Sequence, residues 1–107
     1  MADIAELEAK AEEVAGLLGA ISNPRRLIIL CKLVQAGEMT VSALQEGSAL
    51  SQSALSQHLA VMRGEGLITA RKDGLNMHYR IADPRAMELM SSLEKIFCST
   101  LDHGEPK

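Results

Sequence analysis

The spacing of apolar residues changes twice along this chain, and the change restricts the possible folds more than any other feature. Helical spacing extends to about residue 64, strand-like alternation follows over residues 67–81, and helical spacing returns over residues 86–97. Because an apolar face recurs about every 3.6 residues in a helix and about every two in a strand, we expect helices on both sides of one β-hairpin. The 107 residues fit a single domain, expected over residues 1–101, with a disordered tail at 102–107.

Residues that start and stop helices divide the helical parts into segments. Asn23 before Pro24 supplies a capping side chain followed by a residue that needs no N–H, which predicts a helix start. Gly37 predicts the end of that helix, because glycine readily adopts the left-handed conformation that follows a helix. The helices expected on such grounds lie at residues 4–21, 24–36, 40–45, 51–64 and 84 to about 98. Asp73-Gly74 predicts the turn of the hairpin.

The helix expected over residues 51–64 has two contrasting faces. With Leu55 toward the core, Leu59 and Met62 lie on the same side. Other positions carry uncharged polar side chains, namely Gln52, Ser53, Ser56 and Gln57. A short helix, a glycine-containing turn and such a second helix predict a helix-turn-helix. With the hairpin, the expected fold is mostly α with a two-stranded β-hairpin wing: a winged helix-turn-helix with additional N- and C-terminal helices.

The charge pattern favours a DNA-binding surface in the middle of the chain. The net charge is −3, but the acids concentrate near the N-terminus, whereas residues 51–80 carry an excess of arginine and lysine. Amides and hydroxyls pair with base edges in the major groove, and cations beside them suit phosphates. The expected DNA contacts are Gln52, Ser53, Ser56, Gln57, His58, Arg63, Arg71, Lys72 and Arg80. The alternative is a winged-helix protein-interaction module whose charged hairpin is only solvated.

Four separated motifs carry the most specific signal in the sequence. They are SNPRRLIIL at residues 22–30, LSQSALSQHL at 50–59, GLI at 66–68 and the wing at 71–79. In this order they resemble the ArsR/SmtB family of bacterial dimeric repressors, and the resemblance covers most of the chain. It implies a homodimer that binds double-stranded operator DNA and assembles through its first and last helices.

A dimer also suits the composition of the chain. With one Phe, one Tyr and no Trp, the core must be aliphatic, and a monomer of this size would be marginally stable. The seam of apolar residues over 4–21 and the apolar stripe over 86–97 are the surfaces available for a second copy. The dimer contacts expected there are Leu7, Val14, Leu18, Met90, Leu93 and Phe97.

The two cysteines are the candidate sensing residues. Residues 40–50 contain no Cys and residues 83–101 no His, so the paired-thiol and carboxylate–histidine metal sites found in the family are not expected. Cys31, Cys98 and His103 would make an incomplete tetrahedral metal set. Composition alone favours cysteines as small buried hydrophobic residues. The pair nevertheless resembles the sulfide- or persulfide-responsive subgroup of the family, which includes the biofilm growth repressors and the HlyU-type regulators.

That resemblance implies a thiol switch. The repressor would hold its operator while Cys31 and Cys98 are reduced and release it when they are bridged. The inducer would be a sulfane sulfur species or an oxidant, with no cofactor and no resident metal. A metal- or arsenite-sensing repressor is the alternative.

Other function classes find no support in the sequence. No Ser, His and Asp constellation, phosphate-binding glycine loop or carboxylate pair is recognisable, so we expect no enzymatic activity and no catalytic residues. No apolar run approaches the roughly 18 residues of a membrane span. The acidic N-terminus does not resemble an export signal, so a cytoplasmic protein with reduced thiols is expected.

Overall fold

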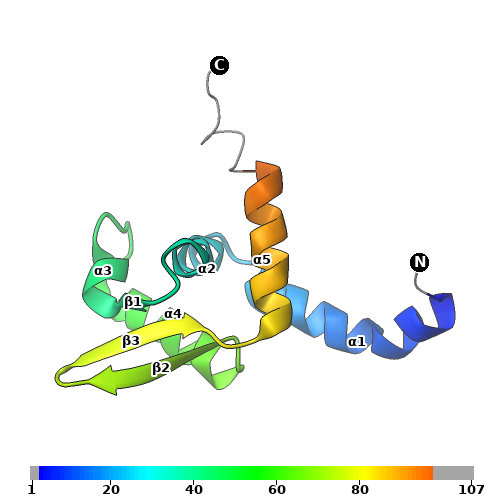
Figure 1. Cartoon of the computed structure of the whole chain (residues 1–107), viewed down its shortest axis with the longest axis horizontal. Coiled ribbons are helices and arrows are strands. Elements are labelled where there is room, and N and C mark those ends of the chain that lie inside the picture. The colour runs from blue at the N-terminus through cyan, green and yellow to red at the C-terminus, as the bar shows by residue number, and fades with distance from the viewer. Residues whose placement is uncertain (1–2, 98–107) are drawn as a thin grey trace, which may run out of the picture.

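The structure, a computed structural model, describes residues 3–97. In chain order the elements are α1 (Ile4–Ile21), α2 (Pro24–Ala36), β1 (Met39–Thr40), α3 (Val41–Gln45), α4 (Gln52–Gly64), β2 (Ile68–Asp73), β3 (Asn76–Ile81) and α5 (Pro84–Phe97). Figure 1 shows the hairpin and α1 at opposite ends of the molecule, with α2 and α5 between them. The winged-helix prediction is confirmed. Cys98 and the predicted tail at 102–107 lie outside the described residues.

The helices begin where the sequence predicts because side chains accept their first backbone N–H groups. Asn23 Oδ1 accepts from the N–H groups of Arg25 and Arg26 at 2.9 and 3.2 Å. The other helices have corresponding caps at Asp3, Thr40, Ser51 and Asp83. Gly37, with a φ of 82°, follows α2 and donates its N–H to the Leu33 carbonyl at 2.7 Å. These local signals therefore fix the helix boundaries.

The core is aliphatic, and α2 lies at its centre against α5 and β3. The buried side chains are Ile21, Ile29, Leu30, Leu33, Leu44, Leu55, Leu59, Met62, Leu67, Ile68, Ile81, Ala86 and Met90. Within residues 3–97 no polar or charged side chain is buried, so apolar burial is the main stabilising contribution. The core does not surround α2 completely, since Ile28 faces outward and is about half-exposed.

The sheet has three antiparallel strands rather than the predicted two, in the order β1-β3-β2. The additional strand, β1, pairs Met39 with Tyr79 and Thr40 with His78. Two residues are too few to show an alternating pattern, which is why the sequence did not reveal this strand. Its pairing ties the end of α2 and the start of α3 to the wing.

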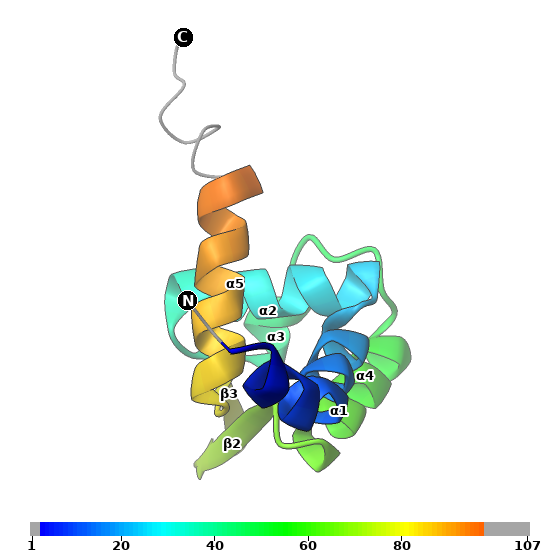
Figure 2. The same ribbon diagram turned by 90° about the vertical axis from the view of Figure 1, so that its right-hand side faces the viewer.

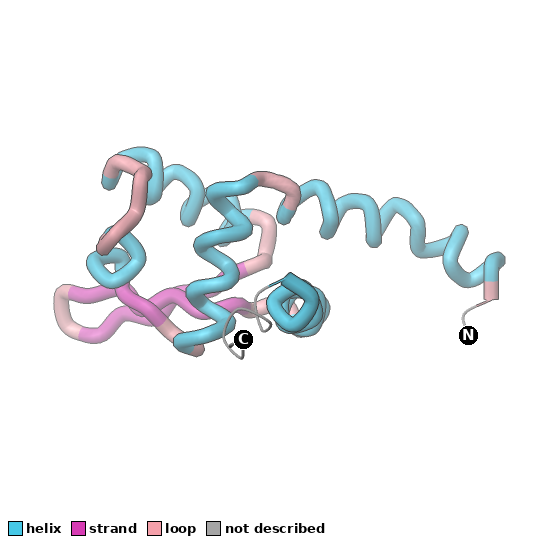
Figure 3. The backbone as a smooth tube through the Cα atoms, turned by 90° about the horizontal axis from the view of Figure 1, so that it is seen from above, coloured by secondary structure: helices cyan, strands magenta, loops and turns pink. Residues whose placement is uncertain are grey.

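The N-terminal helix α1 extends away from the rest of the protein (Figures 1 and 3). Its C-terminal end is attached: Ile21 lies in the core and Leu17 and Ala20 pack against it. Figure 2, seen from the α1 side, shows α5 upright beside this attachment. An ion pair between Arg85 of α5 and Glu13 of α1 adds a polar tie. Most of α1 is therefore solvated on all sides in the protomer.

No single helix among residues 3–97 is long and apolar enough to span a membrane. Taken together, α1 and α2 reach the required length and composition, but the chain bends by 92° between them. The buried side chains of this pair, Ile21 among them, belong to the core described above.

Candidate functional site

The helix-turn-helix consists of α3 and α4, and polar contacts hold the turn between them. Gln45 Nε2 donates to the Leu50 carbonyl at 2.6 Å, and Ser48 Oγ accepts from the Leu50 N–H at 3.0 Å. Gly47 has a φ of 71°, which residues with a Cβ rarely adopt. Both helices also bury leucines in the common core. The turn and the core together determine how α4 is presented to solvent.

The two faces of α4 are separated as predicted. Leu55, Leu59 and Met62 are buried. The predicted contact residues Gln52, Ser53, Ser56, Gln57 and Arg63 are exposed. His58 is half-buried at the edge of this face. Within residues 3–97 the four amide and hydroxyl side chains make no hydrogen bond to another group, so their donors and acceptors remain available to a ligand.

The hairpin distributes its predicted phosphate contacts over two faces of the sheet. The register pairs Arg71 with His78 and Lys72 with Met77, and side chains alternate along a strand. Arg71 and Arg80 therefore share the face opposite the core, whereas Lys72 points to the other face. All three cations are exposed, but the structure does not bring them together into one patch.

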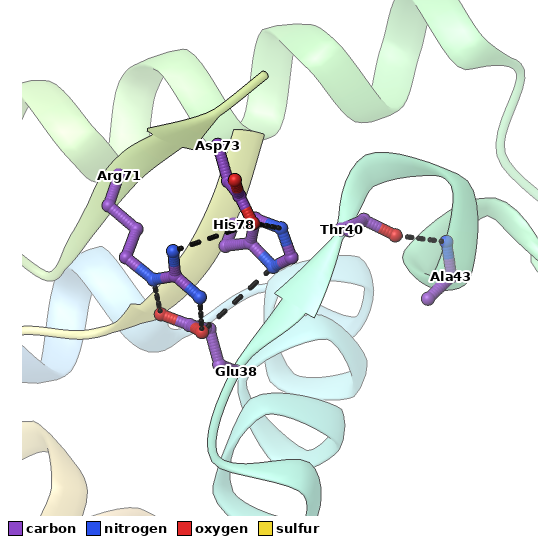
Figure 4. Close-up of polar contacts among 6 residues, drawn as sticks. All are labelled: Glu38, Thr40, Ala43, Arg71, Asp73 and His78. Carbon is purple, nitrogen blue, oxygen red and sulfur yellow. Dashed lines mark hydrogen bonds and ion pairs between the residues drawn. The ribbon is translucent and has the colours of Figure 1, made fainter. Parts of the chain in front are cut away.

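A polar cluster joins the wing to the loop after α2 (Figure 4). The Arg71 guanidinium donates to the two carboxylate oxygens of Glu38 through Nε and Nη2, both at 2.9 Å. His78 lies between two acids, with Nδ1 3.9 Å from Glu38 and Nε2 3.9 Å from Asp73. The hydrogen-bonded guanidinium lowers the pKa of Glu38, and the carboxylate raises the pKa of Arg71. Arg71 is thus already paired in the protein without DNA.

A small apolar cavity of about 190 Å³ lies where α2 meets α5. Its lining consists of Leu27, Cys31, Met90, Leu93 and Phe97. Cys31 is half-buried there, and Cys98, which follows Phe97 in sequence, is not among the described residues. In the part of the chain that is described, no group of three or more His, Cys, Asp or Glu side chains could hold a metal ion.

The predicted dimer contacts differ in exposure. Leu7, Val14 and Leu18 of α1 and Phe97 at the end of α5 are exposed, and Leu93 is half-buried. Met90 has 0% of its surface exposed and belongs to the core of the protomer. It lies one turn beyond buried Ala86, on the face of α5 that packs inward. Met90 is thus buried within its own protomer, and its role as a dimer contact stays a prediction.

Comparison with known proteins identifies the family. The model of the bacterial regulatory protein arsR family matches residues 23–70. The chain is 40% identical over 98 residues to the HTH-type transcriptional regulator YgaV of Escherichia coli K12, covering 92% of this chain and 99% of that protein. The chain belongs to the ArsR family.

Solved structures extend the similarity of this ArsR-family protein beyond the helix-turn-helix. The transcriptional repressor BigR from Xylella fastidiosa matches with a TM-score of 0.83 and 36% identity, covering 91% of this chain and 98% of that one. Reduced HlyU from Vibrio cholerae N16961 matches with a TM-score of 0.80 and 38% identity, covering 87% and 97%. This ArsR-family protein is therefore a DNA-binding transcriptional regulator and not an enzyme.

Two residues of this ArsR-family protein were not predicted from its sequence. Glu38 has no local signal, because its partner Arg71 lies 33 positions away. Leu75, at the tip of the hairpin, is 100% exposed and follows Gly74, whose φ is 63°. A leucine directly after a turn glycine was the available signal for an apolar tip.

Proposed function

We propose that this ArsR-family regulator is a homodimeric repressor that releases its operator when Cys31 and Cys98 become bridged. The observation that carries the proposal is the position of Cys31 in the cavity between α2 and α5. Phe97 lines the same cavity and is joined directly to Cys98 in the chain. A bridge between the two thiols would connect the central helix of the core to the end of α5. A reducing cytoplasm keeps both thiols available for this reaction.

On DNA, α4 lies in the major groove. Its exposed amides and hydroxyls match the donors and acceptors of base edges, and we assign the exposed cations Arg63, Lys72 and Arg80 to phosphates. The base contacts are assigned to Gln52, Ser53, Ser56 and Gln57. A two-fold dimer then contacts two half-sites about 34–36 Å apart, so the operator is nearly palindromic.

The dimer forms through α1 and the end of α5. Ile4, Leu7, Val14 and Leu18 are 42–67% exposed along one seam of a helix that has little contact with its own protomer. Contiguous apolar surface of this kind marks an interaction site, whereas single exposed apolar residues do not. Exposed Ile96 and Phe97 extend the apolar surface at the end of α5. Burying these side chains supplies the apolar area that a small aliphatic core lacks.

Similarity to two relatives supports this proposal. The biofilm growth-associated repressor of Xylella fastidiosa is 37% identical over 94 residues, covering 88% of this chain. The matching structure of HlyU from Vibrio cholerae is that of the reduced protein. These relatives belong to the types that the sequence pattern of Cys31 and Cys98 resembles.

An organic persulfide can close the bridge without a further oxidant. Each Cys thiolate takes the outer sulfur of the persulfide and releases the organic thiol, which leaves a protein persulfide. The terminal sulfur of one protein persulfide then displaces hydrosulfide from the inner sulfur of the other. The product is a trisulfide between Cys31 and Cys98. A disulfide needs Cα atoms about 4.4–6.8 Å apart, and the inserted sulfur relaxes this limit.

The test compares the wild type with Cys31→Ser and Cys98→Ser under anaerobic treatment with an organic persulfide. Intact mass and titration of a duplex selected by the protein from random-sequence DNA are measured on the same samples. We expect the wild type to gain one sulfur and lose two hydrogens, with operator affinity falling about 5- to 150-fold. Each serine variant should keep its affinity. Ala36→Ser, at an exposed position of α2, adds a hydroxyl without removing a thiol and should respond like the wild type.

Two outcomes would contradict the thiol switch. A full response of either serine variant would mean that one cysteine carries the signal alone. Stoichiometric zinc or arsenite in the purified protein, lost on Cys31→Ser, would instead favour the metal-sensing alternative. Elemental analysis of the same preparations distinguishes these cases.

A further inference from the structure

The charges on the outer face of the wing nearly cancel. Arg71 and Arg80 lie on this face of the hairpin together with Asp73 and His78. Glu38, from the loop after α2, reaches the same face and forms the two hydrogen bonds to Arg71. The two arginines are balanced by the two carboxylates of Glu38 and Asp73. This face therefore attracts phosphate less than its arginine content suggests.

The contact between Glu38 and Arg71 uses the groups that a phosphate would need. A guanidinium binds carboxylate and phosphate through the same planar pair of N–H donors. Both Nε and Nη2 of Arg71 donate to Glu38, and Nη1 lies 4.0 Å from Asp73. Arg71 and Glu38 remain partly exposed, so an incoming phosphate can reach the pair. The carboxylate has a lowered pKa because of Arg71, which keeps it charged at neutral pH.

We propose that Glu38 competes with the DNA backbone for Arg71 and thereby limits the affinity and salt dependence of DNA binding. Glu38 acts as an internal substitute for phosphate. While the pair is intact, Arg71 releases no counterion from the DNA and adds nothing to the salt dependence. The proposal rests on the docking described above, in which the wing lies against phosphates.

The opposite role for Glu38 makes a different prediction. If Glu38 positioned Arg71 for a phosphate contact, its removal would weaken DNA binding and flatten the salt dependence. Competition predicts stronger binding and a steeper salt dependence once the carboxylate is gone. The two roles are separated by the sign of both changes.

The experiment titrates the selected operator with wild type, Glu38→Gln, Arg71→Ala and the double variant at several salt concentrations. Each phosphate newly neutralised steepens the slope of log K against log salt by about 0.9. We expect Glu38→Gln to steepen the slope by about 0.9 and to raise affinity about two- to fivefold at low salt. The double variant should return to the wild-type slope, because it lacks both Glu38 and Arg71 and so has no additional cation for a phosphate.

Two matched variants complete the experiment. Glu46→Gln removes an exposed carboxylate at the C-terminal cap of α3 that forms no ion pair with Arg71, and should leave the slope unchanged. Lys72→Ala removes a wing cation that pairs with no other side chain among the described residues, and should flatten the slope by about 0.9. Thermal melting of each variant establishes that the fold is retained.

The outcomes separate this inference from the docking on which it rests. If Lys72→Ala flattens the slope but Glu38→Gln does not steepen it, competition by Glu38 is wrong and the docking stands. A double variant that behaves like Glu38→Gln would show that Arg71 is not the cation released, which also overturns the inference. If neither Lys72→Ala nor Glu38→Gln changes the slope, the wing does not lie on phosphates and both are wrong.

Discussion

The two amphipathic helices α1 and α4 use their leucines in opposite ways. In α4, Leu55 and Leu59 are buried against the sheet and the other helices. In α1, Leu7 and Leu18 remain about half-exposed on a helix that projects from the protein (Figure 1). Their polar faces differ as well, since α4 presents uncharged amides and hydroxyls while α1 presents mainly acids.

The difference shows that an apolar seam predicts which face of a helix is covered but not what covers it. The same period of apolar residues occurs in both helices. The protomer covers the seam of α4, which leaves its polar face for DNA. The seam of α1 is left uncovered by the protomer, and the proposed dimer would bury it against a second copy.

The largest effect is expected from a charge on the α1 seam. In a symmetric dimer Leu18→Glu occurs twice, and a central apolar contact contributes about 2 kcal/mol or more. Dimer affinity should therefore fall by about 4 kcal/mol, or roughly a thousandfold. Sedimentation should find monomers that do not bind the operator tightly. Lys10→Glu adds the same side chain to α1 off the seam and should stay dimeric; a dimeric Leu18→Glu protein would remove α1 from the interface.

Much of the fold follows from local patterns. Asn23, Gly37 and Ser51 act within a few residues of the helix ends that they determine, so the boundaries of α2 and the start of α4 could be predicted. The polar face of α4 was predictable for the same reason, because residues 52–57 follow one helical period. Residues close in sequence were therefore sufficient to predict the helix boundaries that capping side chains determine.

The remaining features depend on contacts between distant parts of the chain. Strand β1 exists because Met39 and Thr40 pair with β3. Glu38 accepts hydrogen bonds from Arg71 because the hairpin brings the two residues together. The burial of Met90 in the protomer was not predicted, because its position on the apolar stripe of α5 does not reveal which side chains belong to the core. In each case the contact partner is set by the tertiary fold and not by the residues next in sequence.

Truncating a buried leucine of α4 should destabilise the protein more than truncating an exposed leucine of the α1 seam. In the Leu18→Glu background, which removes the dimer, Leu55→Ala should lower the free energy of unfolding by about 2–5 kcal/mol, since it leaves a cavity. Leu7→Ala in that background should change it by less than about 0.5 kcal/mol, because the side chain is already exposed. Urea unfolding measures both. Comparable losses would mean that α1 packs on its own protomer.

The polar face of α4 is expected to distinguish DNA sequences, whereas the acidic face of α1 is not expected to contact DNA. Gln57→Ala should weaken operator binding by about 1–3 kcal/mol and leave binding to an unrelated duplex nearly unchanged. Lys72→Ala should weaken both duplexes alike, because phosphates carry no sequence. Glu8→Ala on the exposed face of α1 should alter neither. A uniform loss with Gln57→Ala would contradict the placement of α4 in the major groove.

The smallest effect concerns Arg85, which links α1 to the start of α5 by pairing with Glu13 of α1 and with Asp83 before α5. Hydrogen bonds from Arg85 lower the pKa of Asp83 from 3.8 to about 2. Because the folded pKa lies below the unfolded one, the ionised carboxylate stabilises the fold fully above about pH 4, and this stabilisation disappears toward pH 2.

Asp83→Asn isolates this charge, since asparagine still accepts the N–H of Arg85 as a helix cap. At pH 7 the variant should lose less than about 1 kcal/mol of the free energy of unfolding, as expected for a partly exposed ion pair. The difference from wild type should vanish as the pH falls from 4 to 2. Glu88→Gln, which removes an exposed acid of the same helix, should leave the free energy of unfolding at pH 7 nearly unchanged. Urea unfolding of each protein between pH 2 and 7 measures the free energy of unfolding. A difference that persists at pH 2 would mean that the amide disturbs the cap itself, and that the link between α1 and α5 does not depend on the charge of Asp83.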